Sequence, residues 1–344
     1  MNPGPEGSFP NEAAVLPGLA LFRAHENQTG GELWRTDGSA AGTMLVKDLW
    51  ASPGDSSPLF LPARRADGPA LLTAFDPAHG FEPWRTDGTP AGTRLLRDIN
   101  PGPAPSTRDP AALWMGRDLY FNADDGTLGA ELWRTDGTEA GTSMVVDLWP
   151  GPAGSSAIPL AVIGGRMVVV ADDGIHGREP WVTDGTAAGT RLLRDLNPGP
   201  ADSHPRAITG LSGSLLFTAD DGVRGREPWT TDGTPEGTAL IRDINPGPGS
   251  GVANAHVEFT RLHDLVYFAA DDGVNGIELW RTDGSSAALV GDLNPGAAGS
   301  APYGMRAMGD AFWFGATDAL GVELWRSDGS TGGTPGSPTS PPAS

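Results

Sequence analysis

Pairs of adjacent aspartates are the residues of this chain best suited to binding a metal ion. Each pair precedes a glycine, and four such pairs recur at intervals of 48, 48 and 51 residues. Adjacent carboxylates repel each other unless they are solvated, hydrogen-bonded or bound to a cation, and Ca²⁺ suits a site made only of oxygen ligands. Because there is no Asp-x-Asp-x-Asp-Gly loop, a solvated turn is the alternative interpretation. The candidate metal ligands are Asp124, Asp125, Asp172, Asp173, Asp220, Asp221, Asp271 and Asp272.

Two tryptophans are the candidate ligand-binding residues. The position after an Asp-Leu or Asp-Ile dipeptide holds Asn in four places, but it holds Trp50 and Trp149 in two others. An exposed Trp can stack on the apolar face of a sugar ring or on a partner side chain. The alternative is that each Trp covers a neighbouring hairpin. The substitution predicts a contact with a glycan or a protein.

No residues with a catalytic spacing are found in the sequence. There is no Cys, no Gly-x-Ser-x-Gly, no P-loop and no dinucleotide motif, and the six histidines share no metal-ligand spacing such as His-x-x-x-His. We therefore expect no catalytic residue, no enzyme and no required cofactor, with Ca²⁺ as the one cation under consideration. The sequence does not indicate an oligomeric state.

The charge and the hydropathy exclude two classes of partner. The formal charge is −20 and no Lys/Arg run interrupts it, so the chain should repel the phosphates of nucleic acids. No apolar run approaches the roughly 18 residues that a membrane span needs.

A phrase that occurs seven times defines the elements that must position these residues. It reads Glu-Leu/Pro-Trp-x-Thr/Ser-Asp-Gly, and its tryptophans are spaced by 50, 49, 48, 48, 51 and 45 residues. The full unit from Asn197 to Ile244 contains four short β-like runs bounded by Gly, Pro or Asp, and no stretch has a sustained helical period. The seven tryptophans are Trp34, Trp84, Trp133, Trp181, Trp229, Trp280 and Trp325.

Four antiparallel strands repeated about every 48 residues are typical of a β-propeller blade. The predicted fold class is all-β: a single seven-bladed β-propeller of four-stranded antiparallel blades over residues 1–330, the last blade lacking its own outer strand. Residues 331–344 are rich in Ser, Pro and Gly, and we expect them to be a flexible tail. The predicted units are 2–49, 50–99, 100–148, 149–196, 197–244, 245–293 and 294–330.

The recurrent residues are predicted to have structural roles. A binding platform rarely needs seven equivalent tryptophans, whereas seven blade interfaces do, so we expect these side chains to pack between blades. The Asp of each Thr/Ser-Asp-Gly phrase should accept turn hydrogen bonds, and the strand-end aspartates such as Asp48 should act as turn or capping residues. Because the last unit lacks a strand, we expect poorer contacts around Trp325 and the lowest local stability there.

The repeat resembles the ELWxxDGT repeat of bacterial secreted and surface proteins, with a full match from Glu131 to Thr138. The units also resemble the tryptophan-docking segment of quinoprotein propellers, Ala-x-Asp-x-x-x-Gly-x-x-x-Trp, as at Ala123, Asp125, Gly129 and Trp133. The first resemblance implies a propeller outside the cytoplasm without a known activity. The second implies shared packing between blades and does not imply the quinone cofactor.

These observations predict a non-enzymatic binding or structural module that is extracellular, on the cell surface or periplasmic. It would serve adhesion or the recognition of a glycan or a protein. One alternative is an enzyme with a site at the central channel, as in quinoprotein or hydrolytic propellers. The other is a calcium-stabilised structural repeat protein.

Overall fold

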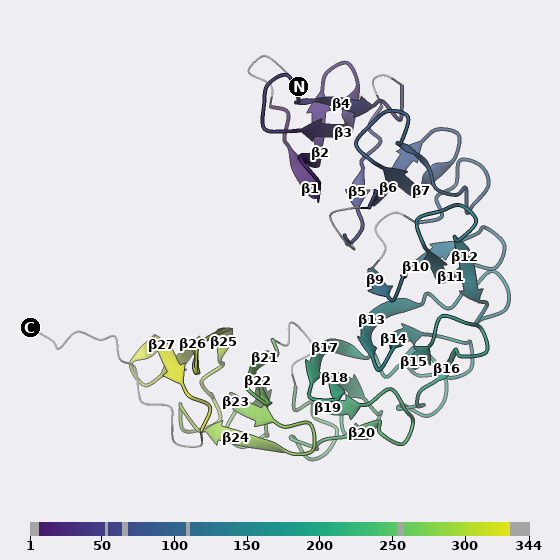
Figure 1. The fold of residues 1–344 in the computed structure, drawn as a ribbon. Helices are drawn as coiled ribbons and strands as arrows, with labels where there is room; N and C mark the ends of the chain where they lie inside the picture. Colours follow the sequence, from purple (N-terminus) through teal and green to yellow (C-terminus); the bar gives the residue numbers. More distant parts are fainter. Residues whose placement is uncertain (1–6, 52–53, 64–67, 108–110, 253–257, 331–344) are drawn as a thin grey trace, which may run out of the picture. The chain divides into compact units, whose positions relative to one another are not determined.

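The chain folds into short antiparallel β-sheets that follow one another along the sequence. The computed structural model describes residues 7–51, 54–63, 68–107, 111–252 and 258–330, and within these ranges there is no helix. Seven sheets are formed, six of four strands and one of three (Figure 1). The predicted fold class, an all-β seven-bladed propeller whose last blade lacks an outer strand, is confirmed. The predicted flexible tail, residues 331–344, lies outside the described residues.

The first three sheets are built from consecutive strands. The first contains β1 (Asn11–Leu16), β2 (Leu19–Glu26), β3 (Gly30–Thr36) and β4 (Met44–Lys47). The second contains β5 (Leu59–Phe60), β6 (Ala70–Asp76), β7 (Gly80–Thr86) and β8 (Arg94–Leu95). The third contains β9 (Ala112–Met115), β10 (Asp118–Asp124), β11 (Ala130–Thr135) and β12 (Ser143–Val146).

The next four sheets repeat this order. The fourth contains β13 (Ile158–Ile163), β14 (Arg166–Ala171), β15 (Glu179–Thr183) and β16 (Arg191–Leu192). The fifth contains β17 (Arg206–Leu211), β18 (Ser214–Asp220), β19 (Arg226–Thr231) and β20 (Ala239–Leu240). The sixth contains β21 (Thr260–Leu262), β22 (Leu265–Asp271), β23 (Ile277–Thr282) and β24 (Ala287–Gly291). The seventh contains β25 (Tyr303–Met308), β26 (Ala311–Asp318) and β27 (Gly321–Ser327).

The described chain divides into two compact units. One is Met1–Pro159, Ala171–Gly174 and Gly185–Gly189, and the other is Leu160–Val170, Ile175–Asp184 and Thr190–Ser344. The first three sheets therefore belong to one unit and the last three to the other.

Local turn chemistry explains why the strands end where they do. Asp87 accepts hydrogen bonds from the backbone N–H of Thr89 at 2.9 Å and from its hydroxyl at 2.7 Å, and the intervening Gly88 has φ +84°. Only glycine adopts that conformation without strain. Asp37, Asp136, Asp232, Asp283 and Asp328 accept the equivalent bonds in their own turns. The predicted turn role of these aspartates is therefore seen in the structure.

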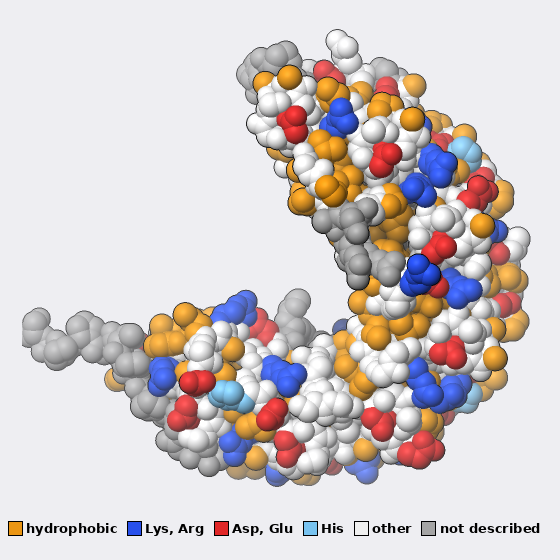
Figure 2. Space-filling view, viewed as in Figure 1, with side chains coloured by type: hydrophobic (Ala, Val, Ile, Leu, Met, Phe, Trp, Pro, Cys, Tyr) orange, Lys and Arg blue, Asp and Glu red, His pale blue; other side chains and the backbone are white. Residues whose placement is uncertain are grey.

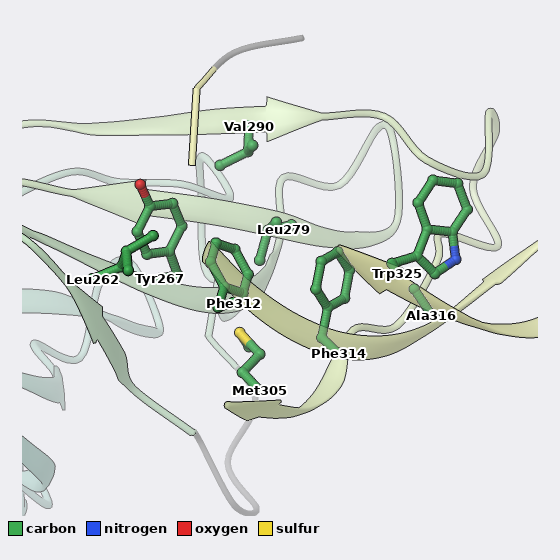
Figure 3. Packing of buried hydrophobic residues seen from close by; sticks show 9 residues of the cluster. All are labelled: Leu262, Tyr267, Leu279, Val290, Met305, Phe312, Phe314, Ala316 and Trp325. Carbon is green, nitrogen blue, oxygen red and sulfur yellow. The ribbon is translucent and has the colours of Figure 1, made fainter. Parts of the chain in front are cut away.

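The core lies between successive sheets rather than within one of them. The last such core joins the sixth and seventh sheets, where Tyr267 and Phe312 meet with their ring centroids 4.6 Å apart (Figure 3). Phe314 and Trp325 continue this cluster on the seventh sheet, beside Leu279 and Val290 of the sixth. Burying this apolar surface is the main source of stability for sheets too small to fold alone.

The repeat tryptophans pack as predicted, but the expected weak contact at Trp325 is not seen. All seven are buried, and Trp325 is 5% exposed, the same as Trp133 and Trp229. The reason is direction: Trp84 packs against the sheet that precedes its own, in a cluster with Leu21 and other residues of the first sheet, and Trp325 packs in the same way beside Leu279 and Val290 of the sixth. Trp325 therefore has the whole sixth sheet as its neighbour. Trp34 of the first sheet is also 5% exposed.

Candidate functional site

The glutamate of the repeated phrase forms the junction between successive sheets. Glu82 lies near the start of β7, the third strand of its unit, and is fully buried. It accepts hydrogen bonds from the hydroxyl of Ser106 at 2.6 Å and from the backbone N–H of Ile99 at 3.0 Å. Ser106 belongs to the loop that opens the next unit, and its own carbonyl accepts from the N–H of Asp124. The carboxylate thus accepts hydrogen bonds from both units and ties them together.

The same arrangement recurs at every junction that the described residues contain. The glutamates are Glu32, Glu82, Glu131, Glu179, Glu227 and Glu278, and their loop partners are Ser56, Ser106, Ser155, Ser203, Gly251 and Ser300. The sequence analysis gave this glutamate no role. The signal was present as a Ser 24 residues after the Glu in the first four units.

Burial changes the acidity of these carboxyl groups. Desolvation raises the pKa of Glu32, Glu82, Glu179 and Glu227 to about 7, although the hydrogen bonds from the next loop act in the opposite direction. Desolvation also raises the pKa of Glu131 and Glu278. Loss of contact with water disfavours the charged form, which is why the shift is upward.

Cationic side chains add two further kinds of contact at the junctions. Arg242 of the fifth unit lies over the ring of Trp280 of the sixth at 5.2 Å, and Arg97 and Lys47 lie in the same way over Trp133 and Trp84. The arginine after the repeat Trp donates to the carbonyl of the next turn glycine, as Arg85 does to Gly137 at 2.9 Å. These contacts explain why Arg or Lys precedes several of the strand-end aspartates.

Two repeated polar groups are buried without a hydrogen-bond partner among the described residues. One is the indole N–H of all seven repeat tryptophans, a group that usually has a hydrogen-bond partner when it is buried. The other is Oδ1 of the strand-end aspartates, for which a turn or capping role was predicted: Asp48, Asp98, Asp147, Asp195 and Asp243. No turn or capping hydrogen bond to this oxygen is found among the described residues.

The Asp-Asp-Gly pairs lie where the second strand leads into the loop before the third strand, in the third to sixth sheets. Backbone N–H groups of the same loop donate to their carboxylates. Asp124 accepts from the N–H of Gly126, and Asp125 accepts from the N–H of Thr127 and of Leu128 at 2.8 and 2.7 Å. Desolvation works to raise the pKa of Asp125, but these hydrogen bonds outweigh it and hold the pKa below its usual value. Asp221 and Asp272 have the same balance.

Metal binding by these aspartates stays a prediction. Within the part of the chain that the structure describes, no group of three or more His, Asp or Glu side chains is arranged to hold a metal ion. Each Asp-Asp pair is separated from the next by a whole unit of the repeat, and the histidines add no third ligand. His79, for example, pairs with Asp76 of its own loop at 2.8 Å.

Trp50 and Trp149 lie against the units that follow them. The ring of Trp50 is 4.7 Å from that of Phe75 in β6, and the ring of Trp149 lies against Gly174 of an Asp-Asp-Gly loop, where no Cβ would fit. Asn100 occupies the same place beside Gly126. Both tryptophans are half-buried. The structure therefore brings them to loop contacts, and a ligand-binding role for the rest of their surface stays a prediction.

The residue at the tip of the loop between the second and third strands differs between the first three repeat units and the last four. The tip residue is defined here as the one that directly follows the Asp-Asp-Gly segment or its equivalent. It is Gln28, Ala78 and Thr127 in the first three units, and Ile175, Val223, Val274 and Leu320 in the last four. These four side chains are between 67% and 79% exposed. We call them the aliphatic rim; sequence reasoning missed it, although the position could be read from the repeat.

Comparison with known proteins gives a fold and no family. No family model and no curated protein matches the chain. Among solved structures, it is similar to a prolyl endopeptidase (10% identity, TM-score 0.44, 96% of this chain and 50% of the other). It is also similar to a puromycin hydrolase (17%, 0.42, 98% and 55%) and to a puromycin-hydrolysing peptidase of Mycobacterium tuberculosis (13%, 0.42, 97% and 55%).

The peptidase matches contradict the prediction that the protein is not an enzyme, and that prediction is withdrawn. Sequence identities of this size show a likeness of fold alone. The chain spans about half the length of each of these peptidases. Hydrolysis is therefore stated of those proteins and is not transferred to this chain. Separately, no helix among the described residues is long and apolar enough to cross a membrane.

Proposed function

We propose that the chain is a recognition module that binds a protein partner through the aliphatic rim. The observation that carries the proposal is the exposure of Ile175, Val223, Val274 and Leu320 at one equivalent position of four successive units. Single exposed aliphatic residues are ordinary on protein surfaces, but these four recur at the same position of the repeat, which chance exposure does not explain. All four lie in the compact unit that contains the last three sheets.

The loops hold these tips rigidly, which favours binding. The N–H of Val223 donates to Asp221, that of Val274 to Asp272 and that of Leu320 to Asp318, at 3.0, 2.9 and 2.7 Å. A tip fixed by its own loop loses little conformational freedom when a partner binds. Exposed loops on a rigid scaffold are also where propellers and other β-proteins carry their binding residues.

The chemistry of the partner follows from the rim and its surroundings. Aliphatic tips call for an apolar surface, while the neighbouring aspartates and the net charge of −20 favour Lys and Arg around it. A protein suits this better than a glycan, because the exposed tips are aliphatic and not aromatic. The resemblance of the repeat to secreted proteins supports a location outside the cytoplasm as part of this proposal.

Selection of peptides tests the proposal. A random phage-displayed library is selected on the full chain, and the affinity of the enriched peptides is then measured for the fourfold variant I175T/V223T/V274T/L320T. Threonine is chosen because Thr127 occupies this tip in the third unit. We expect enriched peptides to combine apolar and basic residues and to lose at least roughly tenfold in affinity, about 1.4 kcal/mol.

A matched control separates the rim from general exposed apolar surface. The variant V15T/M308T changes two aliphatic side chains that are 67% and 66% exposed elsewhere, and it should bind like the wild type. Equal binding by the rim variant and the wild type would refute the proposal. The alternative is a glycan site at Trp50 and Trp149. It would be favoured if the chain bound to a glycan array, if W50A/W149A lost that binding and if the rim variant retained it.

A further inference from the structure

The second sheet departs from the repeat in the connection between its first two strands. In the other six sheets this connection is a two-residue turn, as at Gly116-Arg117 and Ser212-Gly213. In the second sheet it runs from residue 61 to residue 69. A two-residue turn is enough to join two antiparallel strands, so the additional length is not needed to form the sheet.

Trp114 of β9 is a second departure from the repeat, and it contacts the first. The strand pairing places Val15, Gly210 and Arg261 at the equivalent position of three other sheets, so the ring of Trp114 is not part of the repeated packing. Its indole N–H donates to the carbonyl of Pro62 in the long connection at 2.7 Å. This hydrogen bond holds the ring beside the connection.

The long connection and Trp114 border an apolar pocket of about 130 Å³. All of its lining residues belong to one compact unit. Leu16 of β1, Leu61 of the connection and Leu71 of β6 line it and are 7%, 8% and 5% exposed. Figure 2 shows hydrophobic side chains gathered over β1 and the neighbouring second sheet. Because these leucines also belong to the packed cores, the pocket is formed before any ligand binds.

The polar groups that border the pocket already have partners. Besides the indole bond, the carbonyl of Gly137 accepts from Arg85 at 2.9 Å. Oδ1 of Asp136 accepts from the hydroxyl and the N–H of Thr138 at 2.6 and 2.9 Å, and these bonds hold the pKa of Asp136 below its usual value. Arg117 also lowers this pKa, so the carboxylate has a cation near it. The pocket therefore repels an anion and has no unshared negative charge for an ammonium group.

We propose that this pocket binds a small uncharged molecule with a single aromatic ring. An engineered apolar cavity of about 150 Å³ takes up benzene, so a pocket of this size accommodates one ring. Trp114 supplies an aromatic side chain for stacked or edge contact. A charged group would lose its water without gaining a partner, which is unfavourable. This site is separate from the aliphatic rim, whose four residues belong to the other compact unit.

Binding of fluorobenzene to the full chain, followed by ¹⁹F NMR, tests the proposal. We expect saturable binding with a dissociation constant on the order of 1 mM. Ala14→Leu extends a half-buried side chain that lines the pocket, and it should weaken binding at least roughly tenfold because the ring and the larger side chain need the same space. Ala161→Leu is the matched control. Ala161 is half-buried two residues before the end of β13, as Ala14 is in β1, and it does not line the pocket.

A second variant and two competitors make the test decisive. Trp114→Leu removes the aromatic ring and should also weaken binding, and it decides the result if circular dichroism shows that Ala14→Leu does not fold. Toluene should displace fluorobenzene, whereas benzoate and benzylammonium at the same concentration should not.

Three results would overturn the proposal. One is the absence of saturable binding by the wild type, and another is unchanged binding by the folded Ala14→Leu variant, or by Trp114→Leu in its place. The third is displacement by benzoate or benzylammonium as effective as that by toluene. The fourfold rim variant should bind fluorobenzene like the wild type, so this result is independent of the proposed function.

Discussion

Glu82 accepts a hydrogen bond from the hydroxyl of Ser106 at 2.6 Å, and this contact joins the second unit to the third. Three backbone N–H groups, of Ile99, Asn100 and Ser106, donate to the same carboxylate. A buried acceptor with four donors makes the junction dependent on one side chain.

Removal of this carboxylate should be costly. Glu82→Ala leaves buried donors without an acceptor, at about 1–3 kcal/mol for each group that water cannot reach. We expect Glu82→Ala to lower the free energy of unfolding by at least about 3 kcal/mol, measured by urea denaturation. Glu323→Ala removes the same residue type at a position where no side-chain hydrogen bond is found among the described residues, and it should cost less than about 0.5 kcal/mol. Equal costs would mean that the junction bonds contribute little.

The stability should fall as the pH rises through neutrality. Burial raises the pKa of Glu32, Glu82, Glu179 and Glu227 from 4.5 to about 7. A group whose pKa is higher in the folded state stabilises the fold fully below 4.5, and this contribution is lost as the pH rises through about 7. The melting temperature should therefore be higher at pH 5 than at pH 8.

A variant identifies the groups responsible for this pH dependence. Glu82→Gln removes one titrating carboxyl, so the decrease in melting temperature between pH 5 and pH 8 should be smaller in this variant. The turn aspartates cannot produce the effect, because hydrogen bonds from Thr89 and its equivalents lower the pKa of Asp87 and of Asp232 below 3.8. A melting temperature that rises from pH 5 to pH 8 would contradict the assignment.

Truncating the repeat tryptophans should be equally costly in the third and seventh units. Trp133 and Trp325 are both 5% exposed, and each packs against residues of the preceding sheet. Trp133→Ala and Trp325→Ala should therefore each lower the free energy of unfolding by about 3–5 kcal/mol. Chemical denaturation of the two variants measures these costs. A clearly smaller cost for Trp325→Ala would mean that the three-stranded sheet relaxes around the truncated side chain.

Amide exchange should be faster in residues 302–330 than in residues 160–240. The seventh sheet has three strands where the others have four, so its hydrogen bonds should open at a lower free energy. Hydrogen exchange monitored by mass spectrometry measures the difference between the two segments. Equal protection of the two segments would contradict this expectation.

Millimolar Ca²⁺, added after chelator treatment, distinguishes the two interpretations of the Asp-Asp-Gly loops, because a solvated turn leaves the melting temperature unchanged. The aspartates of each Asp-Asp-Gly loop already accept hydrogen bonds from their own loop, as Asp125 does from Thr127 and Leu128. A cation that bound the folded chain would raise the melting temperature by mass action. A clear increase, absent in Asp125→Asn, would show instead that these loops take Ca²⁺.

The sequence alone determined the strands, the turns and the number of blades. This was possible because the information is local: Asp87, Gly88 and Thr89 form their turn from neighbouring residues, and the same phrase recurs seven times. The packing role of the repeat tryptophans also followed from repetition. The end of the last blade after three strands was visible as the loss of the fourth apolar run.

Only the tertiary structure decided what each repeated side chain faces. Glu82 finds its partner 24 residues later in another unit, and Trp325 faces backward onto the sixth sheet and not toward the incomplete end. The exposure of Val223 and its equivalents also depends on which neighbours cover them. A repeat pattern gives the position of a side chain in its own sheet, but burial and hydrogen bonding across a junction are properties of two units packed together.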